Sequence, residues 1–348
     1  MTRLDDYRSA LLATFADVAD AELAAALQQG GADFVSFIID HGLGPLWHER
    51  TGRDEFHDCR MTAEALYLGQ EHALNEIATV LDGAGIEFVV FKGAANRLLL
   101  NENPAIRACH DIDLLVCSED RVRAASAMVE VGFTIIPDTL NISHELALSR
   151  GVVDIDLHWD LLREGRLRND CAADMLSRRR REDGIWMLSA EDALFVLLVH
   201  PAFAKHLAGW EMGLHRVVDI VTWLRTQSFD GQEVCAMLKQ NGVQTAAWTT
   251  LRWVQLLTCR SGASPRPLVT LDEMLTDTQP GRLRRKWLDY WLRSNIPERT
   301  SNAHWVRLLG FSPFLHDTPG DAMRALAGRY RAQRRSSNDL EAFEELLN

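Results

Sequence analysis

The chain has 348 residues, of which 47% are hydrophobic and 25% are charged. These are ordinary globular values, far from the low hydrophobicity and high charge of disordered chains, and the length suits about two domains. The longest uninterrupted apolar run covers only residues 193–199, whereas a membrane-spanning helix needs about 20 residues, so no membrane span is predicted. The N-terminal residues include acids and no long apolar stretch, so the expected compartment is the cytoplasm.

The net charge of -12 is unevenly distributed, with acidic residues in excess over residues 1–160 and basic residues in excess over residues 161–348. This charge argues against a protein whose whole surface binds nucleic acid, and the asymmetry suits a metal site that faces a polyanion such as a triphosphate. The six cysteines include no CxxC pair and no Cys/His pair at zinc-finger spacing. Neither a disulfide scaffold nor a structural zinc site is therefore expected.

Helical periodicity dominates both ends of the chain. Residues 1–80 show apolar positions at helical spacing, and a longer helix is predicted from Thr62 to the glycines at 83 and 85. Ser189 begins another predicted helix, with Asp192 in a capping-box-like position. Strand signals fade after about residue 165, so the C-terminal part is predicted to be helical.

Strand signals are concentrated between the helical regions. Residues 86–93 (IEFVVFKG) and 111–117 (DIDLLVC) are short runs rich in strand-forming residues. Residues 144–150 and 152–159 form a hairpin-like pair that is expected to turn at Arg150 and Gly151. A small mixed α and β region is therefore predicted over about residues 81–165.

The first candidate functional residues lie on the second predicted strand. Because alternate side chains of a strand share a face, Asp111 and Asp113 point the same way. Two carboxylates at one point repel each other unless a cation neutralises them, and Mg²⁺ is a typical oxygen-bound cation. The alternative is two acids on a solvated strand face.

A third carboxylate is available on the hairpin. Asp154, Asp156 and His158 share a strand face, so either aspartate could join the first pair across neighbouring strands. Three carboxylates can hold two metal ions about 4 Å apart for in-line displacement at phosphorus. The alternative is a solvated strand edge, with His158 bound to the backbone.

A phosphate cradle is predicted where the first strand leads into a helix. Gly93 lets the backbone approach a phosphate, the helix N-terminus offers free N–H groups, and Lys92 adds a positive charge. Arg107, in the loop before Asp111, either neutralises triphosphate charge or pairs with an acid. The alternative for Lys92 and Gly93 is an ordinary turn between strand and helix.

Several blocks together resemble the bacterial nucleotidyltransferases of the DNA polymerase β superfamily. They are VVFKGAANRLLL, IRACHDIDLLV, VVDIDLHWDL, LSAEDALFVLLVHPAFAKHL and RVVDIVTWL, in this order between about residues 62 and 224. In this branch a lysine and glycine resemble a replacement for the superfamily's glycine and serine. The resemblance implies Asp111, Asp113 and Asp156, in preference to Asp154, as metal ligands.

The resemblance also implies that Lys92 and Gly93 lie at the triphosphate. One departure is the gap between Gly93 and Asp111, which is longer than in many classical members. The loop that contains Arg107 must therefore fold back for Lys92 and the aspartates to contact the same ligand.

The resemblance extends to His200, Lys205, His206 and Asp219, which match positions in the family's helical blocks. The histidines either serve the reaction or pack between helices. Their spacing of six residues does not form an i,i+4 metal pair. Asp219 is either a base that deprotonates an acceptor hydroxyl or a member of a structural salt bridge.

The strongest basic cluster is the run Arg178–Arg181. It is either a phosphate-binding surface for a polynucleotide or a solvated loop. No RNA-binding signature with stacking aromatic residues accompanies it. A nucleic-acid partner therefore remains the less favoured alternative.

We predict an α+β fold with a DNA polymerase β-like nucleotidyltransferase core over residues 81–165. Helical regions over residues 1–80 and 166–348 flank it. The predicted reaction is transfer of an NMP, by superfamily habit AMP from ATP, to a hydroxyl of an acceptor, with Mg²⁺ or Mn²⁺ and release of pyrophosphate. The acceptor is a small molecule, glycan, peptide or protein. The alternatives are a metal-dependent nucleotide-sugar transferase and a non-catalytic NTP-binding module that recruits a partner.

Overall fold

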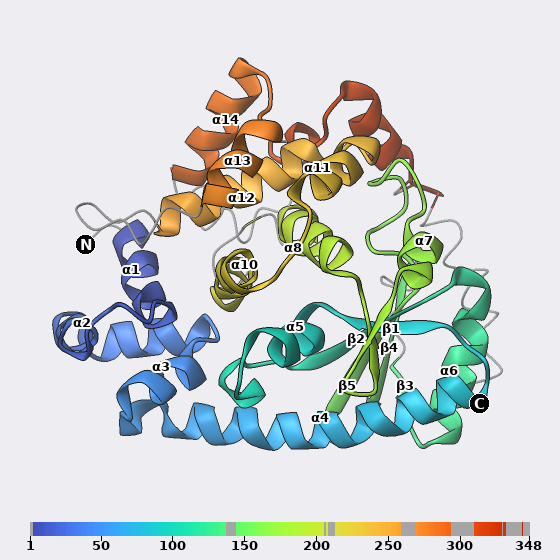
Figure 1. The fold of residues 1–348 in the computed structure, drawn as a ribbon, viewed down its shortest axis with the longest axis horizontal. Helices are drawn as coiled ribbons and strands as arrows, with labels where there is room; N and C mark the ends of the chain where they lie inside the picture. The colour runs from blue at the N-terminus through green and yellow to red at the C-terminus, as the bar shows by residue number, and fades with distance from the viewer. Residues whose placement is uncertain are drawn as a thin grey trace. The chain divides into compact units, whose positions relative to one another are not determined.

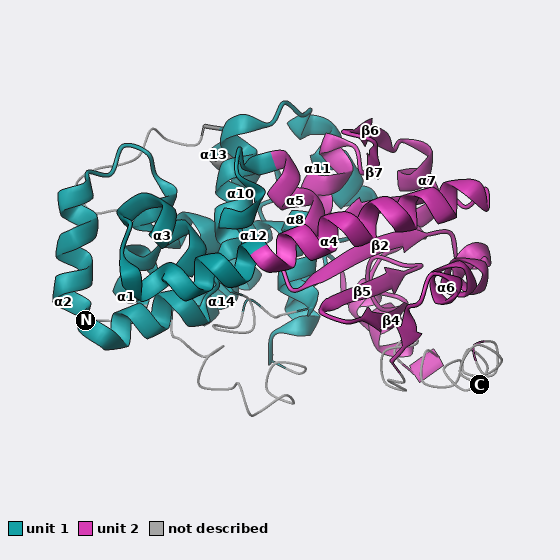
Figure 2. Cartoon of the chain, turned by 90° about the horizontal axis from the view of Figure 1, so that it is seen from below, with its two compact units in different colours: residues 1–64, 100–108, 197–317 teal, residues 65–99, 109–196, 318–348 magenta. Residues whose placement is uncertain are grey.

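The computed structural model describes residues 3–136, 144–204, 207, 213–258, 269–293, 310–328, 330–331 and 343. Contacts divide the chain into two compact units, each assembled from separate segments (Figure 2). Unit 1 contains residues 1–64, 100–108 and 197–317, and unit 2 contains residues 65–99, 109–196 and 318–348. The three consecutive domains expected from the sequence remain a prediction.

Unit 2 contains a seven-stranded sheet with the strand order β3-β4-β5-β2-β1-β7-β6 (Figure 1). In chain order the strands are β1 Phe88–Phe91, β2 Asp111–Val116, β3 Thr134–Ile135, β4 Glu145–Arg150, β5 Val153–His158, β6 Arg180–Glu182 and β7 Ile185–Met187. Strand β2 runs parallel to β5 and antiparallel to β1, so the sheet is mixed. The predicted α+β fold is thus confirmed.

The two faces of the central strands differ in chemistry. One face presents alternate apolar side chains such as Val90, Ile112 and Ile155, which are fully buried in the core of the unit. The α-helices α4 (His57–Gly83) and α6 (Arg121–Glu130) contribute apolar side chains to the same core. Since side chains alternate along a strand, the acids at 111, 113 and 156 are left on the opposite face.

Local signals explain where the elements around the central strands begin and end. Helix α4 is followed by Gly85, whose positive φ of 66° allows the chain to leave the helix and enter β1. Helix α5 (Lys92–Leu100) begins directly after β1. Short 3₁₀ turns precede β2 and α6, at η3 (Pro104–Ile106) and η4 (Ser118–Asp120).

A hairpin that the sequence did not reveal extends the sheet. Strands β6 and β7 pair in antiparallel register, and β7 pairs in parallel with β1 at Val90 and Met187. Helix α7 (Ala172–Ser177) precedes this hairpin and helix α8 (Ala190–Ala204) follows it. The Ser189 hydroxyl accepts the Asp192 backbone N–H at 3.1 Å, as the capping-box-like pattern predicts.

The run Arg178–Arg181 forms the approach to this hairpin and its first strand. Each arginine is within ion-pair distance of a carboxylate, namely Asp192 at 2.7 Å, Glu87 at 2.8 Å, Glu182 at 3.6 Å and Asp82 at 3.6 Å, in chain order of the arginines. The run is thus partly neutralised within the chain, which is unlike a surface prepared for phosphates.

A segment from far along the chain completes unit 2. Residues 319–328 are helical, and Arg168 forms a bidentate ion pair with Asp321 at 2.7 and 2.9 Å. Gly165 and Gly328 let the two backbones touch. A Cβ at Gly328 would lie 2.0 Å from the carbonyl oxygen of Glu164, so no larger residue fits there without a backbone shift.

Unit 1 is helical. Its helices are α1 Arg3–Ala10, η1 Leu11–Thr14, α2 Asp20–Asp40, α3 Gly44–Thr51, η2 Asp54–Phe56, α10 His215–Thr226, α11 Gly231–Gln240, α12 Gln244–Thr258, α13 Val269–Asp277, α14 Arg282–Arg293 and η5 Ser312–Leu315. Its core includes the fully buried aromatic side chains of Trp47, Trp223 and Trp291. Among the residues that the structure describes, no helix is both long and apolar enough to cross a bilayer.

Candidate functional site

The carboxylates predicted from the sequence meet on the polar face of the sheet in unit 2. Asp113 lies directly opposite Asp156 across the parallel pair of β2 and β5, and Asp111 lies opposite Asp154 in the same way. Residues that are opposite each other in a ladder share a face. The parallel pairing of β2 with β5 therefore brings the carboxylates of the two strands close together, as the sequence suggested.

Lys92 reaches this group from the end of β1. Its backbone has a left-handed φ of 51°, which is uncommon for a residue with a side chain. Its ammonium donates to Asp113 Oδ1 at 2.7 Å and lies 3.1 Å from His158 Nε2. A strained backbone at a cluster of charged groups is typical of functional sites.

Asp113 and His158 form the buried centre of the site. Asp113 Oδ1 lies 3.0 Å from His158 Nε2, and the histidine side chain is only 1% exposed. Burial alone would raise the pKa of Asp113, but the charge of Lys92 and the hydrogen bond with His158 outweigh it and hold the pKa well below its usual range. Asp113 is thus held as a carboxylate.

Asp156 behaves in the opposite way. Burial, together with the charges of Asp113, Asp111 and Glu145, raises its pKa from 3.8 to about 7. Two neighbouring carboxylates with divergent pKa values are an arrangement that acid–base chemistry uses. The group also has an excess of negative charge, which a cation would relieve.

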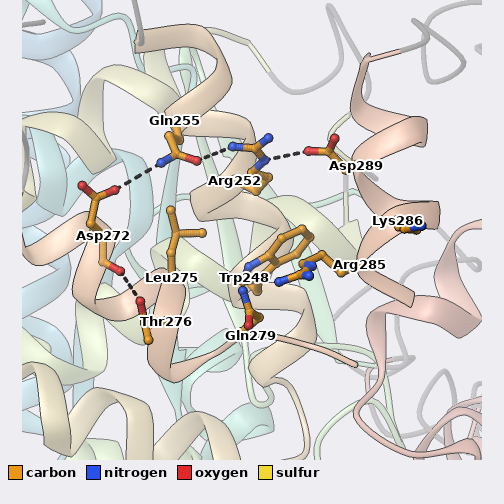
Figure 3. A pocket seen from close by; sticks show the side chains of 10 residues that line it. All are labelled: Trp248, Arg252, Gln255, Asp272, Leu275, Thr276, Gln279, Arg285, Lys286 and Asp289. Atoms are coloured by element: carbon orange, nitrogen blue, oxygen red, sulfur yellow. Dashed lines mark hydrogen bonds and ion pairs between the residues drawn. The ribbon is translucent and has the colours of Figure 1, made fainter. Parts of the chain in front are cut away.

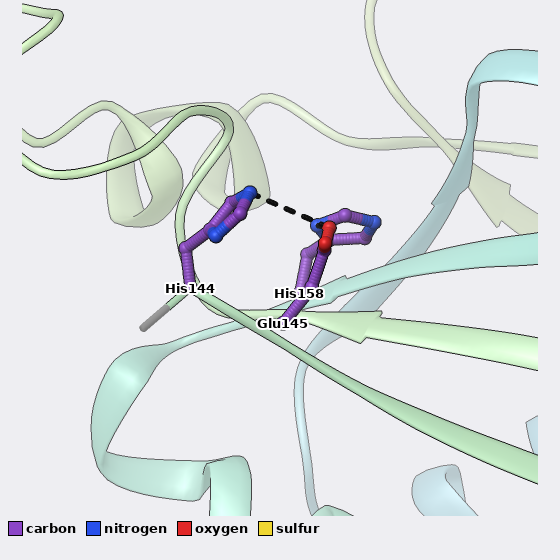
Figure 4. Close-up of side chains that lie close together, drawn as sticks. All are labelled: His144, Glu145 and His158. Carbon is purple, nitrogen blue, oxygen red and sulfur yellow. Dashed lines mark ion pairs between the residues drawn. The ribbon is translucent and has the colours of Figure 1, made fainter. Parts of the chain in front are cut away.

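Two residues that sequence reasoning missed extend the site along the hairpin (Figure 4). Glu145 lies directly opposite His158 across β4 and β5, and His144 immediately precedes Glu145. Burial, and after it the positive charges of neighbouring groups such as Lys92 and Arg163, lower the pKa of His144 from 6.5 to about 2, so its ring is neutral. Only the register of the hairpin could have identified Glu145.

The donor set fits a divalent cation. Ligand atoms of Asp113, Asp156 and His158 lie within 4.8 Å of one another. Asp111, half-exposed at the start of β2, lies outside that compact group but contributes to the raised pKa of Asp156. Carboxylate oxygens suit Mg²⁺, and the excess of negative charge around Asp156 favours a cation there. The unit can therefore hold the ion that the sequence predicts.

The turn that the sequence predicts as a phosphate cradle is the start of helix α5. Gly93 is buried in the first turn of α5, where the backbone N–H groups of a helix have no helical acceptor. Lys92 precedes it, with its ammonium on Asp113. Anion binding at this turn stays a prediction.

Arg107 and Asp219 both belong to unit 1, where they form a buried bidentate ion pair. The guanidinium donates to the two carboxylate oxygens at 3.1 and 2.7 Å. The cavity that these side chains line has a volume of about 20 Å³, room for one water molecule and not for a phosphate. This contact matches the alternative of a structural salt bridge for Asp219, and the role of Arg107 at a triphosphate stays a prediction.

The remaining helical positions are only partly within the structure. His200 is half-buried in α8. Lys205 and His206 lie outside the described residues. The roles of all three therefore stay open.

Unit 1 contains a larger pocket, of about 470 Å³, between α12, α13 and α14 (Figure 3). Along its wall, Arg252 binds Asp289 at 2.7 Å, and Gln255 binds Asp272 at 3.1 Å. These polar groups satisfy one another across the helices. The pocket contains none of the residues that the sequence predicts, and the candidate site is therefore the carboxylate group of unit 2.

Comparison with known proteins agrees with this chemistry. A search of the curated proteins found no match. A family described as uncharacterised nucleotidyltransferases matches residues 33–258, well over half of the chain, and this range includes all of the carboxylates of the site. The chain therefore belongs to this nucleotidyltransferase family and is an enzyme that transfers a nucleotidyl group.

Proposed function

We propose that the enzyme transfers AMP from ATP to a hydroxyl group of an acceptor, with Asp111, Asp113 and Asp156 as the ligands of Mg²⁺. The observation that carries the proposal is the pairing of Asp113 with Asp156 across parallel strands, with Lys92 on Asp113. Bound Mg²⁺ would neutralise these carboxylates and stabilise the charge that develops on the phosphates. Mn²⁺ would suit the same oxygen ligands.

In the proposed reaction the acceptor oxygen attacks the α-phosphorus. The bond from that oxygen to phosphorus forms, the bond to the bridging oxygen of the β-phosphate breaks, and pyrophosphate leaves with the electron pair. Asp156 would be deprotonated once the ion is bound, so that its carboxylate could accept the hydroxyl proton. Asp113, held as a carboxylate, would stay charged throughout.

Lys92 and the first turn of α5, including Gly93, would hold the β- and γ-phosphates. A helix N-terminus offers free N–H groups to an anion, and the ammonium adds a charge. Arg107 would add a second charge only by exchanging Asp219 for phosphate. The acceptor would be a small molecule, glycan, peptide or protein in the cytoplasm.

Thermal unfolding with ligands tests the proposal. ATP with Mg²⁺ should stabilise the protein by about 2.7 kcal/mol at a hundred times the Kd, and neither should do so as well alone. Asp111→Asn should lose this stabilisation. Asp154→Asn, which changes the exposed residue directly opposite Asp111, should keep it.

Three results would contradict the proposal. The first is equal stabilisation of the Asp111→Asn variant. The second is stabilisation by a nucleotide sugar and not by ATP, which would indicate sugar transfer. The third is ATP binding without release of pyrophosphate when acceptors are supplied, which would indicate a binding module.

A further inference from the structure

A second group of side chains of metal-ligating types lies at the open end of the β4–β5 hairpin (Figure 4). It consists of His144, Glu145 and His158. Glu145 and His158 are directly opposite each other in the antiparallel ladder. The backbone N–H of Trp159 donates to the carbonyl oxygen of His144 at 3.0 Å, which fixes the third member beside them. The three side chains are thus positioned by the sheet itself.

The distances in this group match the coordination shell of a small metal ion. Glu145 Oε2 lies 3.2 Å from His158 Nδ1 and 3.4 Å from His144 Nε2. In a tetrahedral site with metal–ligand bonds of about 2.0–2.1 Å, neighbouring ligand atoms are about 3.3 Å apart. The Glu145 oxygen therefore lies where a shared ion would require it.

The buried ring nitrogen of His158 gives an independent indication. Nδ1 is buried and has no hydrogen-bond partner among the described residues, because its approach to Glu145 lacks the alignment of a hydrogen bond. A buried polar atom without a partner is costly, and a metal ion would use its lone pair.

The other nitrogen of the same ring is already engaged. His158 Nε2 lies 3.0 Å from Asp113 Oδ1. Histidine ligands of metals commonly donate their second ring N–H to a carboxylate, which sets the tautomer and leaves the first nitrogen free to bind. Asp113, His158 and an ion at Nδ1 would form such an arrangement.

We propose that His144, Glu145 and His158 bind a divalent transition-metal ion of the Zn²⁺ type, on the side of the His158 ring that faces away from its contact with Asp113. Two imidazoles and one carboxylate suit Zn²⁺, whereas Mg²⁺ prefers oxygen ligands alone. Three protein ligands leave a fourth coordination position open. The site stands on these side chains and holds whether or not the enzyme uses ATP.

Metal titration of the full chain, without nucleotide, tests the site. The protein is freed of metal with a chelator and titrated with Co²⁺, whose visible absorption reports tetrahedral coordination, and Zn²⁺ should displace the Co²⁺. His144→Ala and Glu145→Gln should each weaken Zn²⁺ binding by roughly 100-fold, since each removes a ligand. His72→Ala, which removes an exposed histidine of α4, and Asp111→Asn should bind Zn²⁺ as the unmodified chain does.

Two results would overturn the site. One is the absence of Co²⁺ and Zn²⁺ binding, which would mean that the three side chains only contact one another. The other is binding that Asp111→Asn abolishes and His144→Ala preserves, which would place the ion on the aspartates. Near-UV circular dichroism of the metal-free variants checks folding, and His144→Gln serves as a second variant if His144→Ala does not fold.

Discussion

Asp156 lies directly opposite Asp113, yet of these two carboxylates it is Asp113 that forms the ion pair with the ammonium of Lys92. One carboxylate is thus stabilised as an anion, and the other holds its proton up to a pKa of about 7. The negative charge of Asp113 is therefore balanced by Lys92, whereas a negative charge on the neighbouring Asp156 would not be balanced. The arrangement favours binding of a cation, and it lowers the stability of the folded protein when no metal is bound.

Asp156→Asn should stabilise the metal-free enzyme. The native state holds the Asp156 proton up to about pH 7, whereas an unperturbed aspartate releases it near 3.8. Since the native state binds more protons in this window, the contribution of Asp156 to stability falls as the pH rises through it. The variant should gain on the order of 1–3 kcal/mol at pH 8 and little at pH 4. Urea unfolding at the two pH values measures this, and an equal effect at both would contradict it.

Binding of Mg²⁺ should depend on pH through the same group. Asp156 must lose its proton to bind the ion, so affinity should rise by up to about tenfold per pH unit as the pH approaches 7 from below and level off above it. Isothermal titration in two buffers of different ionisation enthalpy should detect the released proton. Asp156→Asn should flatten this dependence, and an unchanged slope in the variant would exclude Asp156 as its source.

Lys92→Gly should be more stable than Lys92→Ala. Both variants remove the ammonium, so the comparison isolates the backbone, whose φ of 51° lies in the left-handed region. Glycine enters this region without the penalty of a Cβ, which is about 1 kcal/mol. Chemical denaturation of the pair measures the difference. If Lys92→Ala equals or exceeds Lys92→Gly in stability, the left-handed conformation carries no strain.

Asp219→Asn should destabilise the enzyme by about 2–4 kcal/mol, because it leaves the buried guanidinium of Arg107 without its counter-charge. The control is Glu55→Gln in the same unit, where the ion pair with Arg53 is about half exposed and 4.0 Å long. That change should cost about 0.5 kcal/mol or less. A double variant in which Arg107→Met accompanies Asp219→Leu should recover part of the loss, and similar losses at Asp219 and Glu55 would contradict the prediction.

The central strands could be predicted from the sequence because each combines an apolar run or an apolar alternation with a turn signal. Strand β2 matches the predicted residues 111–117 within one residue, and β5 lies within the predicted 152–159. Strands β6 and β7 escaped prediction because each is only three residues long, and because β6 is made of charged residues. In such a strand the ion pairs and the pairing with a neighbour, which are tertiary features, replace the hydrophobic alternation.

The register of the hairpin decides which residue of β5 is the partner of Glu145. A turn at Arg150 and Gly151, as predicted, would place Glu145 opposite Asp156. The observed ladder pairs Arg150 with Val153, which moves the turn by one residue and places Glu145 opposite His158. The periodicity identifies which residues share a face, but the partner of each depends on the turn geometry.

The ion pair of Arg168 with Asp321 joins residues 153 positions apart. During synthesis all described strands of the sheet have been made once residue 187 is added, and the segment that packs on Gly165 follows only after the last part of unit 1. Contacts at such long sequence separation form slowly. The strands of the sheet are thus made early in translation, and the turn at Gly165 stays without its packing partner until the rest of unit 1 has been synthesised.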